Sequence, residues 1–340
     1  MTEAELPAER PASSSAGPPA LELQTFLEAR SLAALREAYA AAGHDFADER
    51  DFTRQAQRDF FRLAREACKV APAAPAALEP VRVACGARSF AVYGVIHGMI
   101  GGASKEYKAF VNACTRQLPL IGFENGLKMF YPAQRAFTIP DYVAMGVCGS
   151  LVTGLQVGFL FPLLLFESLR EVFKLGGGDD DEDWDPVDYT PAYHALDPEL
   201  RRGVEPDPPL PSRLQIEYEL GRWNGGLRAA WENPSAIVPR SMFMAGYALG
   251  YAEREGLEAL DLVVGDLHTM EIVRFLEGEL PTHPLFAKGR AMGARSSARR
   301  RLDLWTSKVR HLGLAGGLGG LILVSMVLLI YNALMVAGVV

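Results

Sequence analysis

The sequence has few cysteines, and none of them form a closely spaced pair. The four cysteines of the 340-residue chain, Cys68, Cys85, Cys114 and Cys148, make no CxxC motif. This spacing excludes a zinc knuckle and a dense disulfide framework, so a reducing compartment is the simpler expectation. HExxH, GxSxG, GxGxxG and P-loop sequences are also absent. The familiar zinc-protease, serine-hydrolase and nucleotide-binding sites therefore lack support.

The chain also lacks an excess of positive charge. Its formal net charge is −7, which argues against a nucleic-acid partner, since such proteins need a basic footprint. Residues 1–20 lack both the basic segment and the apolar segment of a secretory signal. Their Pro/Ser/Ala-rich composition predicts a disordered tail. Residues 176–212 hold eleven acids and two arginines, which predicts a solvated, acidic, Pro-rich loop. EF-hand spacing for Ca²⁺ is missing there.

One long segment has no charge at all. Residues 312–340 are uncharged and strongly apolar, and about 20 such residues suffice for a membrane-spanning helix. We therefore predict a C-terminal transmembrane anchor over 312–340. The preceding juxtamembrane segment, 286–311, carries eight Lys or Arg and one acid, which favours contact with lipid head groups and a cytoplasmic location for the main domain. Two GxxxG pairs, Gly313 with Gly317 and Gly316 with Gly320, suggest a homodimer seam in the membrane.

The segments before the anchor alternate between helix and strand patterns. Apolar residues at helical spacing predict an N-terminal helical region over 21–75. Residues 81–97 and 118–124 and the LDLVVGD segment at 260–266 have strand patterns, and helical patterns follow them. The expected fold class is α/β or α+β, with a central mixed sheet flanked by helices and a C-terminal transmembrane helix.

Two predicted strands end in the same Gly-x-x-His motif. Gly94-Val-Ile-His97 and Gly265-Asp-Leu-His268 each follow an apolar strand and precede a helix. A third strand ends at Glu124. Because open α/β folds keep their sites at the carboxyl edge of the sheet, two imidazoles and one carboxylate are expected to converge there as a metal or acid–base site. Satisfied histidines at strand ends remain the alternative. Asp266 and Glu271 are further potential ligands, although we expect Glu271 at the surface.

These motifs resemble those of the TraB/PrgY superfamily, which includes the TIKI proteases. The first block, GVIHGMIGGASKEYKAFVNACTRQLPLIGFENG, and the second, from RSMFMAGYALGY to VVGDLHTMEIVRFLEG, together cover about 80 residues of the chain. The resemblance implies two halves of one domain, over 80–175 and 213–285. It also places His97, Glu124, Arg240 and His268 at the family's motif positions. The Arg240 of the second block lacks the family's usual acidic neighbour and has Pro239 and Ser241 beside it.

The function that this resemblance implies is metal-assisted hydrolysis of a peptide or a similar small amide or ester. His97, Glu124 and His268 would bind a divalent metal, with Mn²⁺ or Co²⁺ favoured over Zn²⁺, and Arg240 would stabilise an oxyanion or bind a substrate carboxylate. The alternative is a non-enzymatic, tail-anchored interaction protein that keeps the fold and binds a peptide. A transporter is disfavoured because it needs more spans.

A second uncharged run, 142–166, lies between the two halves of the expected site. A single membrane crossing there would separate His97 from His268 and forbid a shared metal. We therefore predict a buried or interfacial helical segment, or a re-entrant hairpin broken at Pro162, rather than a single crossing.

Overall fold

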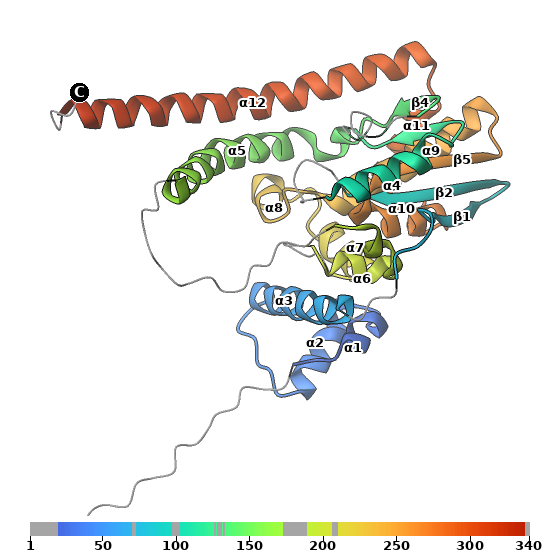
Figure 1. The fold of residues 1–340 in the computed structure, drawn as a ribbon, viewed down its shortest axis with the longest axis horizontal. Helices are drawn as coiled ribbons and strands as arrows, with labels where there is room; N and C mark the ends of the chain where they lie inside the picture. The colour runs from blue at the N-terminus through green and yellow to red at the C-terminus, as the bar shows by residue number, and fades with distance from the viewer. Residues whose placement is uncertain are drawn as a thin grey trace, which may run out of the picture.

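The computed structural model describes residues 20–69, 73–96, 103–125, 127, 131, 133–172, 189–205 and 210–336. The strands are β1 (Val81–Cys85), β2 (Arg88–Val95), β3 (Ile121–Phe123), β4 (Ala136–Thr138) and β5 (Ala259–Gly265). They form one sheet in the order β1-β2-β5-β3-β4, in which β1 is antiparallel to β2 and the other pairs are parallel. This mixed sheet, flanked by helices, confirms the predicted fold class (Figure 1).

Helices cover both faces of the sheet because its strands alternate their side chains between two cores. Leu262 and Val264 of β5 pack with α9 (Ile237–Glu255), α10 (Thr269–Leu276) and α11 (Pro284–Gly293), whereas Val263 between them packs on the opposite face. That second face is covered by α4 (Lys105–Thr115) and the 3-10 helix η2 (Pro191–Ala195). The result is a three-layer arrangement with parallel strand ends gathered at one edge.

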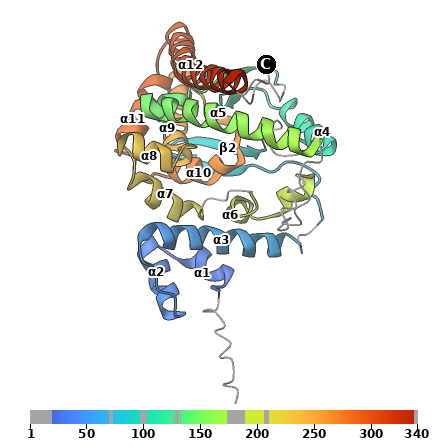
Figure 2. The ribbon, with the colours of Figure 1, turned by 90° about the vertical axis from the view of Figure 1, so that its left-hand side faces the viewer.

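The N-terminal helices form a separate cluster on the outside of this arrangement. They are α1 (Leu23–Glu28), α2 (Leu32–Ala41) and α3 (Glu49–Cys68), within the predicted helical region 21–75. Their buried side chains, such as Phe26 and Phe60, form one apolar cluster with Leu214 of α7 (Ser212–Leu220). Figure 2 shows α1 to α3 packed as an outer layer beneath α6 (Pro198–Arg202) and α7.

The predicted acidic loop over 176–212 needs correction in its second part. Residues 189–205 fold as η2 and α6, and Tyr189 and Tyr193 are buried in the core beside α4. The acidic composition of the window concealed these aromatic residues, which supply the apolar area that a packed segment needs. Residues 173–188, like the predicted tail up to residue 19, lie outside the described residues.

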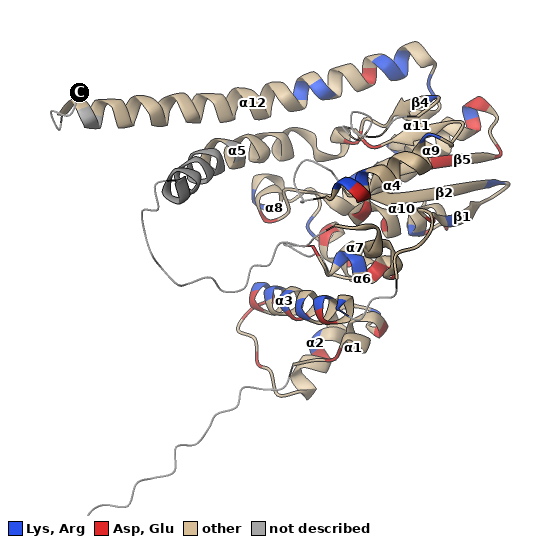
Figure 3. Ribbon diagram, viewed as in Figure 1, with Lys and Arg blue, Asp and Glu red and all other residues tan. Residues whose placement is uncertain are grey.

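The C-terminal helix α12 (Ser297–Val336) is continuous and projects from the domain (Figure 1). Among the described residues it is the one helix long and apolar enough to cross a membrane, over Ser297–Asn332. Figure 3 shows its charged residues confined to the part nearest the domain. Several basic residues of the segment 286–311 pair with acids: Arg290 with Glu253, Arg300 with Glu255, and Arg295 and Arg299 with Asp303.

The other uncharged run forms α5 (Tyr142–Val172), which packs alongside α12 in the same direction. Tyr142 and Ser150 contact His311, and the backbones approach closely where a Cβ on Gly154 would lie 2.7 Å from the Ala315 carbonyl oxygen. The helix continues through Pro162, so the alternative of a re-entrant hairpin broken at that residue is wrong, whereas a helical segment is observed. The interruption is at Gly146, whose φ of 64° is accessible to glycine. The chain segments before and after α5 pack in the same domain. This arrangement agrees with the expectation that α5 does not cross a membrane once and separate them.

Candidate functional site

Glu124 and His268 meet at the carboxyl edge of the parallel strands. Glu124 follows β3, whose neighbour β5 leads into the 3-10 turn η3 (Asp266–His268) that ends at His268. Helix α9 brings Arg240 to the same point. The Nε2 atom of His268 lies 3.5 Å from Oε1 of Glu124, and both side chains are almost completely buried. Three of the four predicted site residues are therefore together in space.

Both oxygens of Glu124 have strong donors. Oε2 accepts a hydrogen bond of 2.6 Å from the backbone N–H of Gly265, and Oε1 accepts one of 2.5 Å from Nη2 of Arg240. Gly265 is the first residue of the second GxxH motif, so this motif supplies a backbone donor as well as an imidazole. Charge-assisted bonds of this kind hold the carboxylate in one orientation.

Arg240 is shared between two carboxylates. Its Nε and Nη2 atoms lie 2.7 and 2.6 Å from Oδ2 of Asp141, the residue directly before α5. Burial raises the pKa of Asp141, and the nearby Arg240 opposes that rise. For Arg240, burial lowers the pKa, but Asp141 and Glu124 outweigh it and the net pKa is raised. Arg240 is therefore a permanent cation between two acids.

Sequence reasoning missed Asp141, which supplies the acidic partner absent beside Arg240 in the sequence. Its Oδ1 also accepts the backbone N–H of Asn125 at 3.3 Å, so it links the end of β3 to α9. The available signal was its position as a lone acid at the head of the uncharged run 142–166. A carboxylate at such a place is seldom buried without a cationic partner.

The contacts of Ser241 favour the tautomer of His268 that carries its proton on Nδ1. Its hydroxyl donates to the Ile237 carbonyl oxygen at 2.7 Å, and Nδ1 of His268 lies 2.7 Å from the same hydroxyl oxygen. Because a hydroxyl has one proton, both contacts are satisfied when Nδ1–H donates to Ser241. Burial lowers the pKa of His268, with Glu124 opposing, so the ring is neutral at pH 7. The lone pair is then on Nε2 and faces Glu124.

An imidazole lone pair and a carboxylate oxygen thus point at one small space. Two acceptors 3.5 Å apart repel each other unless a proton or a metal ion lies between them. Two such groups this close together would be suited to hold one divalent ion between them. An outer hydrogen bond from the other ring nitrogen, as Ser241 accepts here, is the usual support of a metal-binding histidine.

The third predicted ligand, His97, lies outside the described residues. The residue before it is firmly held: the Ile96 N–H donates to the Tyr107 hydroxyl at 2.9 Å, and the Ile96 carbonyl accepts from Tyr131 at 2.7 Å. Across the described residues, no group of three or more His, Cys, Asp or Glu side chains is arranged to bind a metal ion. The described part of the site therefore offers two donors, Glu124 and His268, and fits a divalent ion only with a further ligand.

Asp266 and Glu271 belong to a different cluster, which we term the Arg201–Arg202 network. Asp266 accepts hydrogen bonds from Tyr193 and Arg201 at 2.8 and 2.9 Å. Glu271 forms a buried ion pair with Arg202, so the expectation of a surface position for Glu271 is wrong. Arg201 and Arg202 of α6 are the cationic partners of these acids, and Tyr193 of η2 donates to Asp266. The loop prediction overlooked both elements. Asp266 and Glu271 are therefore not further ligands at the site of Glu124 and His268.

Comparisons of the chain with protein-family models, with curated proteins and with solved structures found no match. The similarity of the two GxxH blocks to the TraB/PrgY superfamily therefore stays a prediction from the sequence motifs.

Proposed function

We propose that the chain is a membrane-anchored, metal-dependent hydrolase of the TraB type that acts on a peptide or a related small amide or ester. The observation that carries this proposal is the convergence of the His268 Nε2 lone pair and the Glu124 carboxylate on one space at the carboxyl edge of the sheet. The two acids and one arginine of this cluster also leave a surplus of negative charge when Glu124 and Asp141 are ionised, which favours a cation.

In this proposal Glu124 and His268 bind a divalent ion together with His97, and Mn²⁺ or Co²⁺ is favoured over Zn²⁺. When bound, such an ion supplies Lewis acidity, which polarises a carbonyl group and lowers the pKa of water. Ser241 keeps Nε2 unprotonated, and Gly265 and Arg240 keep the carboxylate directed at the same space.

Arg240 is the residue that would contact a negatively charged group of the substrate. Asp141 holds the guanidinium from one side, and the side chain retains 13% of its exposure. A guanidinium positioned in advance can stabilise an oxyanion that forms during hydrolysis, or bind a substrate carboxylate, without reorganising. Asp141 acts on this step only through Arg240 and is a positioning residue.

The membrane arrangement is part of the same proposal. Helix α12 is the anchor, the basic segment 286–311 contacts lipid head groups, and the domain lies on the cytoplasmic side. Gly313, Gly316, Gly317 and Gly320 have room for a Cβ with no neighbouring atom within 4 Å. Their face of α12 is thus left open within the described chain, which supports the predicted homodimer seam. A nucleic-acid partner is not part of the proposal.

The test is metal binding by the full chain purified in detergent. We expect stoichiometric Mn or Co in the wild type by elemental mass spectrometry, and loss of that metal in His268→Ala. Ser241→Ala should weaken Mn²⁺ affinity by about 10- to 100-fold, because it removes the hydrogen bond that sets the ring tautomer. Hydrolysis of a quenched peptide library by the loaded protein should fall in parallel.

Ser150→Ala is the matched control, because Ser150 contacts Nδ1 of His311 at 2.9 Å and also donates to a carbonyl four residues earlier. It removes the same type of Ser–His contact in the α5–α12 pair, and we expect unchanged metal affinity. Absence of bound metal together with no effect of Mn²⁺ on the melting temperature would instead support the non-enzymatic, peptide-binding alternative.

A further inference from the structure

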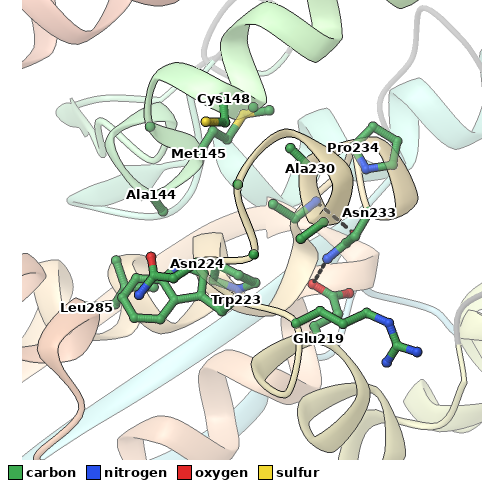
Figure 4. Close-up of a pocket in the computed structure, with 18 of the residues that line it drawn as sticks. Ala144, Met145, Cys148, Glu219, Trp223, Asn224, Ala230, Asn233, Pro234 and Leu285 are labelled. Carbon is green, nitrogen blue, oxygen red and sulfur yellow. Dashed lines mark hydrogen bonds between the residues drawn. The ribbon is translucent and has the colours of Figure 1, made fainter.

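A pocket of about 340 Å³ lies beside the Glu124 cluster, between the first turns of α5 and α8 (Gly226–Glu232). Figure 4 shows side chains from α5, from α8 and from the turn between α7 and α8 around it. Its walls are mainly apolar, with Val143, Met145, Trp223, Ala230 and Leu285 among them. Pockets of this size bind small organic molecules in other proteins. Glu124, His268 and Arg240 do not line it, so it needs a separate explanation.

The pocket lies at the level where the uncharged part of α12 begins. Arg310 is the last formally charged residue before the run 312–340, and the next residue, His311, stacks on Tyr142 with ring centroids 4.2 Å apart. Pocket residues 143–149 follow Tyr142 along α5, in the direction of the apolar run. If α12 enters a bilayer, the pocket is therefore at the interface between head groups and acyl chains.

The protein surface around the pocket is suited to this location. Helix α8 lies on the side of the domain toward which α5 and α12 project (Figure 1). Val147 of α5 and Leu227 and Trp231 of α8 are each more than half exposed. Tryptophan is enriched at membrane interfaces, and exposed apolar side chains are favourable there because they leave water for the acyl region.

Two basic side chains, Lys288 and Arg310, lie close to this apolar pocket. Lys288 lines the pocket, and the described residues provide it with no acidic partner. Arg310 has a buried Nε that likewise finds no hydrogen-bond acceptor within the described chain, and its Nη2 contacts only the Tyr142 carbonyl, at 3.4 Å. Burial, followed by the charge of Arg310, lowers the pKa of Lys288, as expected for neighbouring cations that lack a counter-ion.

The acid that lines the pocket does not neutralise them. Glu219 directs its carboxylate into hydrogen bonds with Gln215, with Asn233 and with the backbone N–H of Val238 at the start of α9. The other basic residue of the wall, Arg222, is already paired with Glu49 and Glu232. Lys288 and Arg310 are thus the charges that remain available for a ligand.

We propose that this pocket binds a membrane amphiphile with an anionic head group. The apolar chain lies between α5 and α8, and the head group contacts Lys288 with Arg310 close by. This assignment rests on the part of the proposed function in which α12 enters the bilayer, and it makes no use of the Glu124–His268 pair. Two sources offer this chemistry, a phospholipid of the bilayer and a free fatty acid.

Trp223 provides the measurement, because it lines the pocket. The full chain carrying Trp184→Phe, Trp231→Phe and Trp305→Phe is placed in phosphatidylcholine nanodiscs with a small fraction of phosphatidylglycerol brominated on its acyl chains. We expect quenching of Trp223 that is stronger than with brominated phosphatidylcholine at the same fraction. Lys288→Glu should reduce the apparent affinity for the anionic lipid by about fivefold or more, since a cation near the head groups contributes about 1 kcal/mol.

Three further variants separate the outcomes. Ala230→Leu fills the pocket and should reduce the quenching, whereas Arg228→Glu, an equal charge reversal on α8 outside the pocket, should leave it unchanged. His268→Ala should also leave it unchanged, so failure of the hydrolase proposal is distinguishable from failure of this one. Quenching by a brominated fatty acid in detergent, but not by the phospholipid, would assign the free acid. Equal quenching by both phospholipids that Lys288→Glu and Ala230→Leu do not alter would overturn the proposal.

Discussion

Two buried charge clusters lie within one domain, and they are balanced differently. In the Arg201–Arg202 network each acid has an arginine of its own: Asp266 pairs with Arg201 and Glu271 with Arg202. In the Glu124 cluster, Glu124 and Asp141 share Arg240, and the neutral His268 adds a further acceptor. The first cluster has as many acids as arginines, whereas the second has one acid more than it has arginines.

This difference is why we assign a structural role to the first cluster and propose a chemical one for the second. Paired charges in a protein interior hold neighbouring elements in register, and here they attach α6 to η3 and α10. An unbalanced cluster with two converging acceptors instead offers a place for a cation that is not part of the chain. Perturbed pKa values alone would not distinguish them, since burial raises the pKa of both Asp141 and Glu271.

The largest expected effect concerns removal of one acid from each cluster. Glu271→Ala leaves Arg202 buried without its partner, and we expect a loss of about 3–5 kcal/mol of unfolding free energy. Glu124→Gln should cost about 1–2 kcal/mol, because Asp141 still neutralises Arg240 and mainly hydrogen bonding is weakened. Denaturant unfolding of the metal-free full chain in detergent measures both. The measurement belongs at pH 8, above the pKa of about 7 to which burial raises Glu271 against the opposing charge of Arg202.

The same pair of variants should show the reverse order in metal binding. Glu124→Gln removes a proposed ligand, whereas Glu271→Ala removes none, so only the former should lower the metal content of the folded protein. Equal stability losses, or metal loss in Glu271→Ala at a temperature where it is folded, would contradict the distinction between the clusters.

An intermediate effect is expected at the first GxxH motif. A Cβ on Gly94 would lie 2.0 Å from Oδ1 of Asp266 and 2.4 Å from Oγ1 of Thr269, so Gly94→Ala forces the Arg201–Arg202 network to move. We expect destabilisation of about 1–3 kcal/mol, as for other overpacked sites, measured by the same unfolding assay. Gly316→Ala is the control, because a Cβ there meets no atom within 4 Å. A loss no larger than that of the control would show that Asp266 is not tightly held.

Sequence reasoning could predict the sheet and the strand ends because both follow from local patterns. Apolar runs that end in Gly-x-x-His or in Glu place these side chains at one edge of a parallel sheet, and Glu124 and His268 do meet there. It could not predict Asp141 as the partner of Arg240, since the two are 99 positions apart and no local pattern links them. Long-range pairing of charges depends on how helices pack and leaves little trace in composition.

For residues 189–205, composition predicts the wrong structure. The many acids and prolines predicted a solvated loop, but Tyr189, Tyr193 and Arg202 are buried. Three acids in this stretch accept hydrogen bonds from groups nearby in the sequence. Asp197 caps α6, Glu199 accepts from the Ser212 N–H, and Glu205 accepts from the Tyr189 hydroxyl. The net charge was counted over the whole window 176–212. The folded segment 189–205 was therefore not distinguished from the acidic residues around it.

The smallest expected effect is a pH dependence at His194, which lies against the balanced network. Its Nε2 is 2.9 Å from the Tyr107 hydroxyl, and burial lowers its pKa to about 4, while the influences of Asp266 and Arg201 oppose each other. The unfolded chain, with a histidine pKa of about 6.5, binds the proton first as the pH falls, so stability is complete above pH 6.5 and decreases toward pH 4. His194→Gln should remove about 1–2 kcal/mol of that decrease, measured as the difference between the two unfolding profiles. If Asp266 were not neutralised by Arg201, it would hold His194 protonated, and the two profiles would run parallel through this range.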